Sequence, residues 1–161
     1  MTRRLYHVAP DGYGPGGHFT RGRYGSAARQ FGPSTARIES PQLGAVMWEM
    51  ALEAARLALA PDAVSRLDCL FTWESLELAR AFRDRFRRGS AIYEVEPLSD
   101  ARFYRGDFGL ISNNVPSGAF VDFMPPIAVR YWTEPPGDQV EVLVGGPVDV
   151  RAVLEPPIAG A

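Results

Sequence analysis

The chain has 161 residues, of which 46% are hydrophobic and 22% charged, and its formal net charge is −2. This length fits one domain with a hydrophobic core, and the composition is that of an ordinary globular protein, which excludes a wholly disordered chain. The small net charge disfavours general binding to nucleic acids or anionic membranes, because both require a basic surface.

The sequence shows no pattern typical of a membrane span or a signal peptide, and it contains one cysteine. No stretch approaches the ~20 apolar residues that span a bilayer, and the basic N-terminus is not followed by an apolar segment typical of a signal peptide. The single cysteine, Cys69, excludes an internal disulfide and suits a reducing compartment. We therefore expect a soluble cytoplasmic protein without a membrane partner.

The first part of the chain predicts a strand, a long loop and a helix. Residues 3–8 read as a short strand. Residues 9–37 are rich in glycine, arginine and aromatics without periodicity, and we expect a mobile glycine-rich loop there. Ser40 and Pro41 suit the cap and first turn of a helix. Its predicted buried face has apolar residues at helical spacing: Leu43, Val46, Met47, Met50, Ala54 and Leu57.

The rest of the chain alternates short strands with one further main helix. We expect strands over residues 66–71, 91–96, 127–132, 139–144 and 148–154, a helix over 74–87, and an irregular aromatic segment over 102–112. Strands mixed with two main helices, without regular strand–helix alternation, indicate the α+β class. We expect a single domain over residues 1–161.

One pair of polar residues stands out near the C-terminus. Gln139 and Glu141 are two positions apart, so in a strand both side chains point to the same face. A carboxylate beside an amide can hold a ribose hydroxyl and stabilise positive charge that develops nearby. The alternative is the exposed face of an edge strand, and the spacing alone favours that alternative.

Several blocks resemble ADP-ribosyltransferases. Residues 135–144 (PPGDQVEVLV) look like the last catalytic strand of that family, where the catalytic glutamate follows two residues after a glutamate or glutamine. Residues 5–8 (LYHV) are similar to the first strand of its histidine-type branch. Residues 69–72 and 91–97, with the helix between them, resemble the middle of the small rifampin-modifying transferases. The chain also resembles a bacterial family of unknown function in the ADP-ribosyltransferase clan.

The resemblance implies a split, strongly bent sheet with NAD in the cleft between its halves. It implies that Glu141 is the catalytic glutamate, binding the nicotinamide ribose, and that His7 anchors the NAD ribose. The tyrosine that stacks on nicotinamide in this branch is missing. The other residues expected around NAD are Thr72, Gln139, Arg66 and one stacking aromatic among Phe71, Tyr93 and Tyr104. Arg66 has a second interpretation as an ion-pair partner of Asp68 or Glu74.

The predicted function is that of an NAD-dependent mono-ADP-ribosyltransferase, with NAD as substrate and a protein, nucleic acid or small molecule as acceptor. A toxin or defence effector fits this activity, with an antitoxin or immunity protein as partner. The alternatives are an NAD glycohydrolase and an inactive fold that binds a nucleotide or a protein. One cysteine and two histidines without tight spacing predict no metal site, and Cys69 is expected to be a buried, inert thiol.

Overall fold

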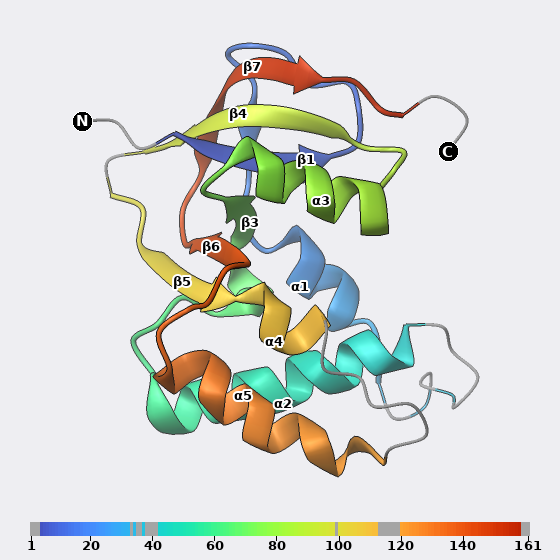
Figure 1. The fold of residues 1–161 in the computed structure, drawn as a ribbon, viewed down its shortest axis with the longest axis vertical. Helices are drawn as coiled ribbons and strands as arrows, with labels where there is room; N and C mark the ends of the chain where they lie inside the picture. Colours follow the sequence, from blue (N-terminus) through green and yellow to red (C-terminus); the bar gives the residue numbers. More distant parts are fainter. Residues whose placement is uncertain are drawn as a thin grey trace.

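A computed structural model describes residues 4–32, 34, 37, 42–98, 100–112 and 120–158. The described chain is an α+β domain built on one seven-stranded sheet, in which the strand order is β2-β7-β4-β1-β3-β6-β5 and every pairing is antiparallel (Figure 1). The strands are β1 (Leu5–Ala9), β2 (His18–Phe19), β3 (Leu70–Trp73), β4 (Ala91–Pro97), β5 (Phe103–Asp107), β6 (Val140–Val144) and β7 (Val148–Glu155). The expected α+β class is therefore confirmed.

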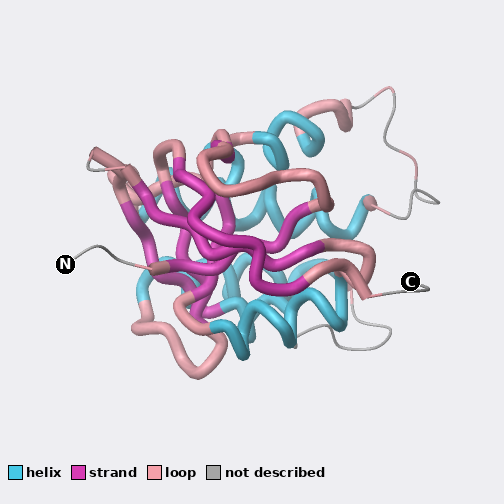
Figure 2. Tube along the Cα trace, turned by 90° about the horizontal axis from the view of Figure 1, so that it is seen from above, coloured by secondary structure: helices cyan, strands magenta, loops and turns pink. Residues whose placement is uncertain are grey.

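In the view from above, the strands form one group and the helices lie around it (Figure 2). They are α1 (Arg23–Ala28), α2 (Leu43–Leu59), α3 (Leu76–Phe86), α4 (Phe108–Ser112) and α5 (Met124–Thr133), with 3-10 turns η1 (Arg66–Asp68) and η2 (Val121–Phe123). α3 packs against β1, β3 and β4, whereas α2 and α5 pack against each other at the far end of the molecule (Figure 1). Within the described residues, no helix is long and apolar enough to cross a membrane.

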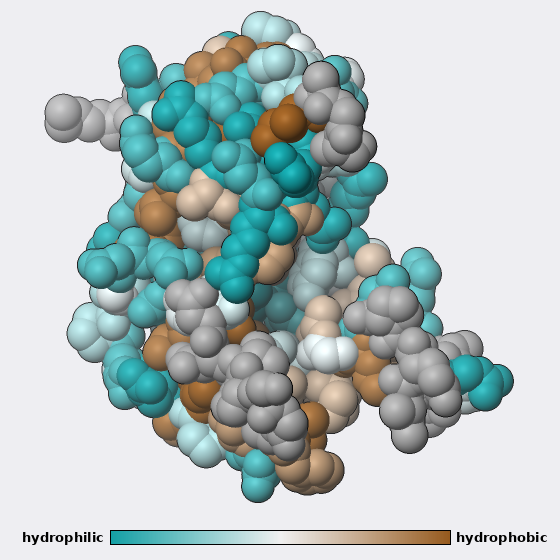
Figure 3. Space-filling model, turned by 45° about the vertical axis from the view of Figure 1, so that its right-hand side comes forward, coloured by the Kyte–Doolittle hydropathy of each residue, from teal (hydrophilic) through white to brown (hydrophobic). Residues whose placement is uncertain are grey.

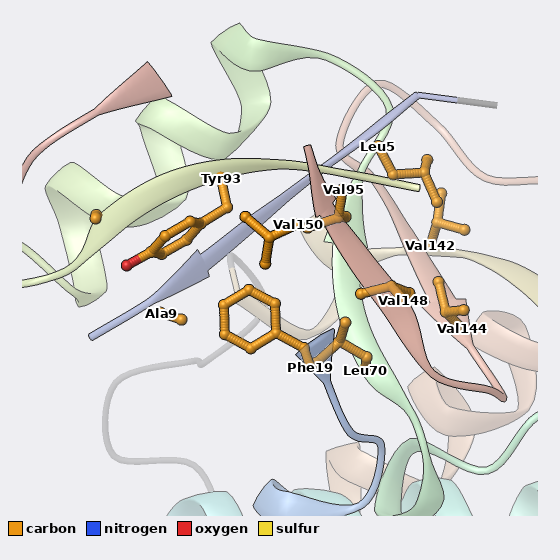
Figure 4. Packing of buried hydrophobic residues seen from close by; sticks show 11 residues of the cluster. Leu5, Ala9, Phe19, Leu70, Tyr93, Val95, Val142, Val144, Val148 and Val150 are labelled. Atoms are coloured by element: carbon orange, nitrogen blue, oxygen red, sulfur yellow. The ribbon is translucent and has the colours of Figure 1, made fainter. Parts of the chain in front are cut away.

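Strand β6 is buried on both of its faces, and this placement defines the site. Val142 and Val144 join a cluster formed largely by β1, β4 and β7 (Figure 4). Leu143, which points the opposite way, packs with residues of α2 and α5. A side chain on the Leu143 face of β6 therefore enters a helix-covered interior.

The sheet is continuous, contrary to the expected split, because β3 pairs with both β1 and β6. The link between β1 and β3 is narrow, since only Tyr6 and Trp73 are aligned across it. By contrast, β1 and β4 align over five residue pairs, from Leu5↔Val95 to Ala9↔Ala91. The narrowest link in the sheet is therefore the β1–β3 junction.

Several predicted elements are wrong. Residues 127–132 belong to helix α5, because prolines in its first turn suit a helix start and Ala128, Tyr131 and Trp132 recur at helical spacing on its buried side. Residues 66–71 divide into η1 and the start of β3, since the Ser65 side chain caps the 3-10 turn by accepting from Leu67 N.

Segments expected to be irregular contain regular structure. Residues 102–112 hold β5 and α4, and residues 9–37 hold β2 and α1, so the long glycine-rich loop is interrupted. With α5, the main helices also exceed the two that were expected. Arg3, Ser40 and Pro41 lie outside the described residues, so the exact starts predicted for the first strand and helix are not addressed.

The predicted buried face of helix α2 is also wrong. Its buried residues are Glu49, Leu52 and Arg56, whereas Met50 and Leu57 are 68% and 61% exposed. Two charged side chains occupy the inner face because each finds an ion-pair partner there. Met50 and Leu57 therefore leave apolar surface on the outer side of α2. Figure 3 shows hydrophobic surface at the lower end of the molecule, while the upper part is mainly hydrophilic.

Candidate functional site

Glu141 lies at the centre of a buried polar network between β6 and the helices. Its side chain faces α5, where the Tyr131 hydroxyl donates a 2.7 Å hydrogen bond to Oε1, and it forms an ion pair with Arg66 Nη1. The residue is 1% exposed. The carboxylate predicted to be catalytic is therefore enclosed by protein.

Arg66 links this carboxylate to a second one. Its Nε donates to both oxygens of Glu49 on α2, at 3.2 and 3.1 Å, and its Nη1 donates to the Tyr131 hydroxyl at 3.0 Å. We refer to Glu49, Arg66, Tyr131 and Glu141 as the buried ion network. The expected partners of Arg66 are wrong, because Asp68 pairs with Arg29 and Glu74 with Arg105.

The network shifts the ionisation of its members. Burial raises the pKa of Glu141, and Glu49 adds to this effect, although Arg66 and the Tyr131 hydroxyl oppose it. Burial alone would lower the pKa of Arg66, but Glu141 and Glu49 hold it well above its ordinary value. Two carboxylates thus share one guanidinium away from water, which is costly unless hydrogen bonds compensate.

Gly106 makes space for this network. It is aligned with Glu141 across the β5–β6 pair, and a Cβ at this position would lie 2.1 Å from the Tyr131 hydroxyl oxygen. No side chain larger than hydrogen fits unless Tyr131 moves. The glycine therefore lets the tyrosine reach the carboxylate.

His7 lies at the β1–β3 junction. Its Nδ1 is 2.7 Å from the Phe71 carbonyl oxygen, so Nδ1 carries the proton and donates, and its ring meets Phe19 edge-on at 4.5 Å. Burial lowers the pKa of His7 to about 4; the bond to Phe71 works against this shift, and the charge of Arg23 adds to it. The imidazole is thus neutral near pH 7, with Nε2 as a hydrogen-bond acceptor.

The remaining predicted NAD residues are mostly engaged within the protein. Thr72 is fully buried and its Oγ1 donates to the Val142 carbonyl at 2.9 Å, while the fully buried Tyr93 donates to the Pro10 carbonyl. Tyr104 donates to the Tyr131 carbonyl, and burial raises its pKa to about 12. Phe71 stacks under Arg66, whose Cζ lies 4.8 Å from the ring centre.

The predicted NAD-binding residues lie on two different faces of the sheet. His7 contacts Phe19, whose ring lies 5.2 Å from that of Tyr93, and these rings belong to the cluster on the Val142 face. Glu141, Arg66 and Phe71 lie on the face covered by helices. The structure therefore brings Glu141 together with Phe71 and Arg66. His7 contacts this group only through the Phe71 carbonyl oxygen, at the β1–β3 junction.

Gln139 does not share the environment of Glu141. It precedes β6, its backbone carbonyl accepts from Phe108 N at 2.9 Å, and its side chain lines a pocket with Trp73 and Phe108. The site residues missed by sequence reasoning are Glu49 and Tyr131. A charged residue at helical spacing with Leu52 and Arg56 was an available signal for Glu49, but nothing in the sequence marked the hydroxyl of Tyr131.

The chain is thus an α+β protein with a buried ion network beside a strand junction that carries His7. Among the described residues, no group of histidine, cysteine, aspartate or glutamate could hold a metal ion. The chain belongs to the family described as protein of unknown function (DUF2441), whose family model matches residues 26–156. No curated protein matches the chain.

Proposed function

We propose that this protein is an NAD-dependent mono-ADP-ribosyltransferase with an acceptor still to be identified. The observation that carries the proposal is the strand order β1–β3–β6, in which Tyr6, Trp73 and Glu141 form one aligned row. The three blocks that resemble ADP-ribosyltransferases, containing His7, Phe71–Thr72 and Glu141, thus come from neighbouring strands although they are far apart in sequence.

In the proposed reaction, the bond between the nicotinamide nitrogen and the ribose anomeric carbon breaks, and its electron pair leaves with nicotinamide. Glu141 would accept a hydrogen bond from the ribose hydroxyl and stabilise the positive charge on the sugar. The acceptor nucleophile then bonds to the anomeric carbon and releases its proton. His7, held by Phe71, would accept a ribose hydroxyl at Nε2.

Access to Glu141 requires the buried ion network to open. The described hydrogen bonds to its carboxylate, from Tyr131 and Arg66, both end on Oε1. Oε2 is therefore the oxygen that would meet the ribose first. A movement that exposes Oε2 while Arg66 keeps Oε1 would preserve the negative charge needed for catalysis.

A second candidate is a module that binds a nucleotide or protein without cleaving NAD. The observation that favours it is the 1% exposure of Glu141. In this case Glu141 and Glu49 have the same role, which is to neutralise Arg66 inside the domain.

The test compares two matched variants, Glu141→Gln and Glu49→Gln, because each removes one carboxylate charge from the same arginine. Purified protein is incubated with NAD, alone and with cell extract, and free nicotinamide is quantified. Catalysis by Glu141 predicts a loss of at least ~100-fold in Glu141→Gln, whereas Glu49→Gln retains most activity of its folded fraction.

The outcomes separate the candidates. Release without extract indicates a glycohydrolase, and release that depends on extract indicates transfer. Equal release by both variants rejects the catalytic role of Glu141. No release by wild type, together with a thermal shift on adding NAD, supports the binding module. Growth arrest on expression that Glu141→Gln relieves would indicate a toxin.

A further inference from the structure

A pocket lined by aromatic rings lies between α3, α4 and the start of β6. Its volume is about 370 Å³, which falls in the range of small-ligand sites. We call it the aromatic pocket; it is lined by Trp73, Leu78, Ala81, Phe82, Arg85, Phe86, Phe108 and Gln139. It is distinct from the buried ion network, none of whose members lines it.

The rings form a packed wall. Trp73 lies 5.1 Å from Phe82 and 5.3 Å from Phe108, and Phe86 lies 5.4 Å from Phe82 and 5.7 Å from Phe108, all between ring centres. Phe86 is 44% exposed, so one face of its ring is open to solvent at the pocket. The wall thus presents aromatic surface to whatever enters the pocket.

The turn before β6, which carries Gln139, is held in place beside this wall by hydrogen bonds. The Asp107 carboxylate accepts from Gly109 N at 2.8 Å and from Gly137 N at 3.1 Å, which ties the turn before β6 to α4. The same turn is held by the bond from Phe108 N to the Gln139 carbonyl. In the part of the chain that the structure describes, the side-chain amide of Gln139 makes no hydrogen bond.

We propose that the aromatic pocket binds a planar heteroaromatic base whose edge carries both a hydrogen-bond donor and an acceptor. Flat rings suit a wall of phenylalanine and tryptophan, because base–aromatic stacking is favourable for any base. The amide of Gln139 offers one acceptor and two donors, a set that pairs with the edge of adenine. This proposal does not depend on NAD cleavage, since its test measures binding of a free base.

The test is a titration of the purified protein with adenine, followed by tryptophan fluorescence. Trp73 lies in the pocket, so saturable quenching is expected in wild type and should be lost in Trp73→Phe, which leaves Trp48 and Trp132 in place. Gln139→Leu should weaken adenine binding by about fivefold, and Phe86→Leu by a similar factor. Unsubstituted purine, which lacks the exocyclic amine but keeps the ring acceptors, should lose less affinity than adenine does in Gln139→Leu.

Gln42→Leu is the matched control, because Gln42 is an exposed glutamine outside the pocket. It should bind adenine as wild type does, and the thermal stability of each variant checks its folding. Absence of saturable binding to folded wild type overturns the proposal. Binding that is unchanged in both Gln139→Leu and Phe86→Leu overturns it as well, because the base would then lie elsewhere.

Discussion

Arg66 connects the other members of the buried ion network. It is 5% exposed and contacts two carboxylates, a tyrosine hydroxyl and an aromatic face. Arginine suits this position because its planar fork can meet several acceptors at once, which a lysine ammonium cannot do in the same geometry. Removing either carboxylate leaves a buried charge short of its partners.

We expect both Glu141→Gln and Glu49→Gln to lower the free energy of unfolding by about 3 kcal/mol, because each breaks a buried ion pair with Arg66. Urea denaturation followed by circular dichroism measures the change. Glu134→Gln serves as the control: its exposed pair with Arg130 on α5 should matter by less than ~1 kcal/mol. A loss in Glu141→Gln no larger than in this control would show that the network contributes little.

The lowered pKa of His7 predicts acid sensitivity. Because the folded protein holds the imidazole neutral down to about pH 4, the unfolded chain binds more protons between pH 6.5 and pH 4. Stability therefore falls as the pH falls through this window, by about 3 kcal/mol for this group. His7→Gln should show a correspondingly shallower decline in unfolding free energy, and parallel profiles would contradict the neutral state of this half-buried histidine.

Cys69 should be inert in the folded protein. It is 2% exposed, its Sγ donates to the Arg66 carbonyl at 3.3 Å, and burial raises the pKa of its thiol far above the ordinary value. A thiol reagent should modify it slowly in buffer and rapidly in denaturant. Fast reaction without denaturant would be inconsistent with this placement.

At the scale of elements, the presence of helices α2 and α3 was predicted from helical spacing, whereas the buried face of α2 and the helix over residues 127–132 were not. Helix α3 was predicted over residues 74–87 and is observed over Leu76–Phe86, because its apolar residues recur at helical spacing and a glycine follows its end. Its cap is Ser75, whose side chain accepts from Leu78 N. The run over residues 127–132 fits a strand and a buried helix equally by composition, and length and tertiary packing decide between them. The spacing of Glu49 with Leu52 and Arg56 indicated a shared helix face, but the burial of Glu49 also depends on Arg66, which lies 17 positions away along the chain. Arg56 finds its partners nearby, at Glu53 and at the Pro61 and Ala63 carbonyls.

The close approach of β5 and α5 gives a prediction at this scale. Gly106→Ala should lower the unfolding free energy by about 2 kcal/mol, because the new methyl group collides with the Tyr131 ring and hydroxyl. Gly44→Ala in α2 is the control: a Cβ there meets nothing within 4 Å, and alanine favours the helix by about 0.5 kcal/mol. Thermal denaturation of the two variants side by side provides the measurement.

At the scale of the whole molecule, the narrow β1–β3 junction does not separate two independent halves. Leu70, Val142 and Val144 come from one side of the junction, yet they pack in the same cluster as Tyr93 and Val150 from the other side (Figure 4). A shared core of this kind couples the two sets of strands energetically. The α+β class was accessible from sequence, but this continuity was not, because it rests on contacts between distant segments.

The shared core predicts a single cooperative unfolding transition. Urea curves followed by tryptophan fluorescence and by far-ultraviolet circular dichroism should coincide, since the tryptophans sample the helix-covered clusters while the dichroism reports on the entire backbone. Two separated midpoints would show that the parts on either side of the junction unfold independently.

The fit between Gly106 and the Tyr131 hydroxyl has a consequence for the family as a whole. A larger residue at the glycine position is tolerable only if the tyrosine is replaced by something shorter, and a shorter residue there leaves Glu141 without its hydroxyl donor. Across an alignment of relatives, the two columns should therefore covary, and lineages that replace the aromatic ring by a shorter side chain should be those free to lose the glycine.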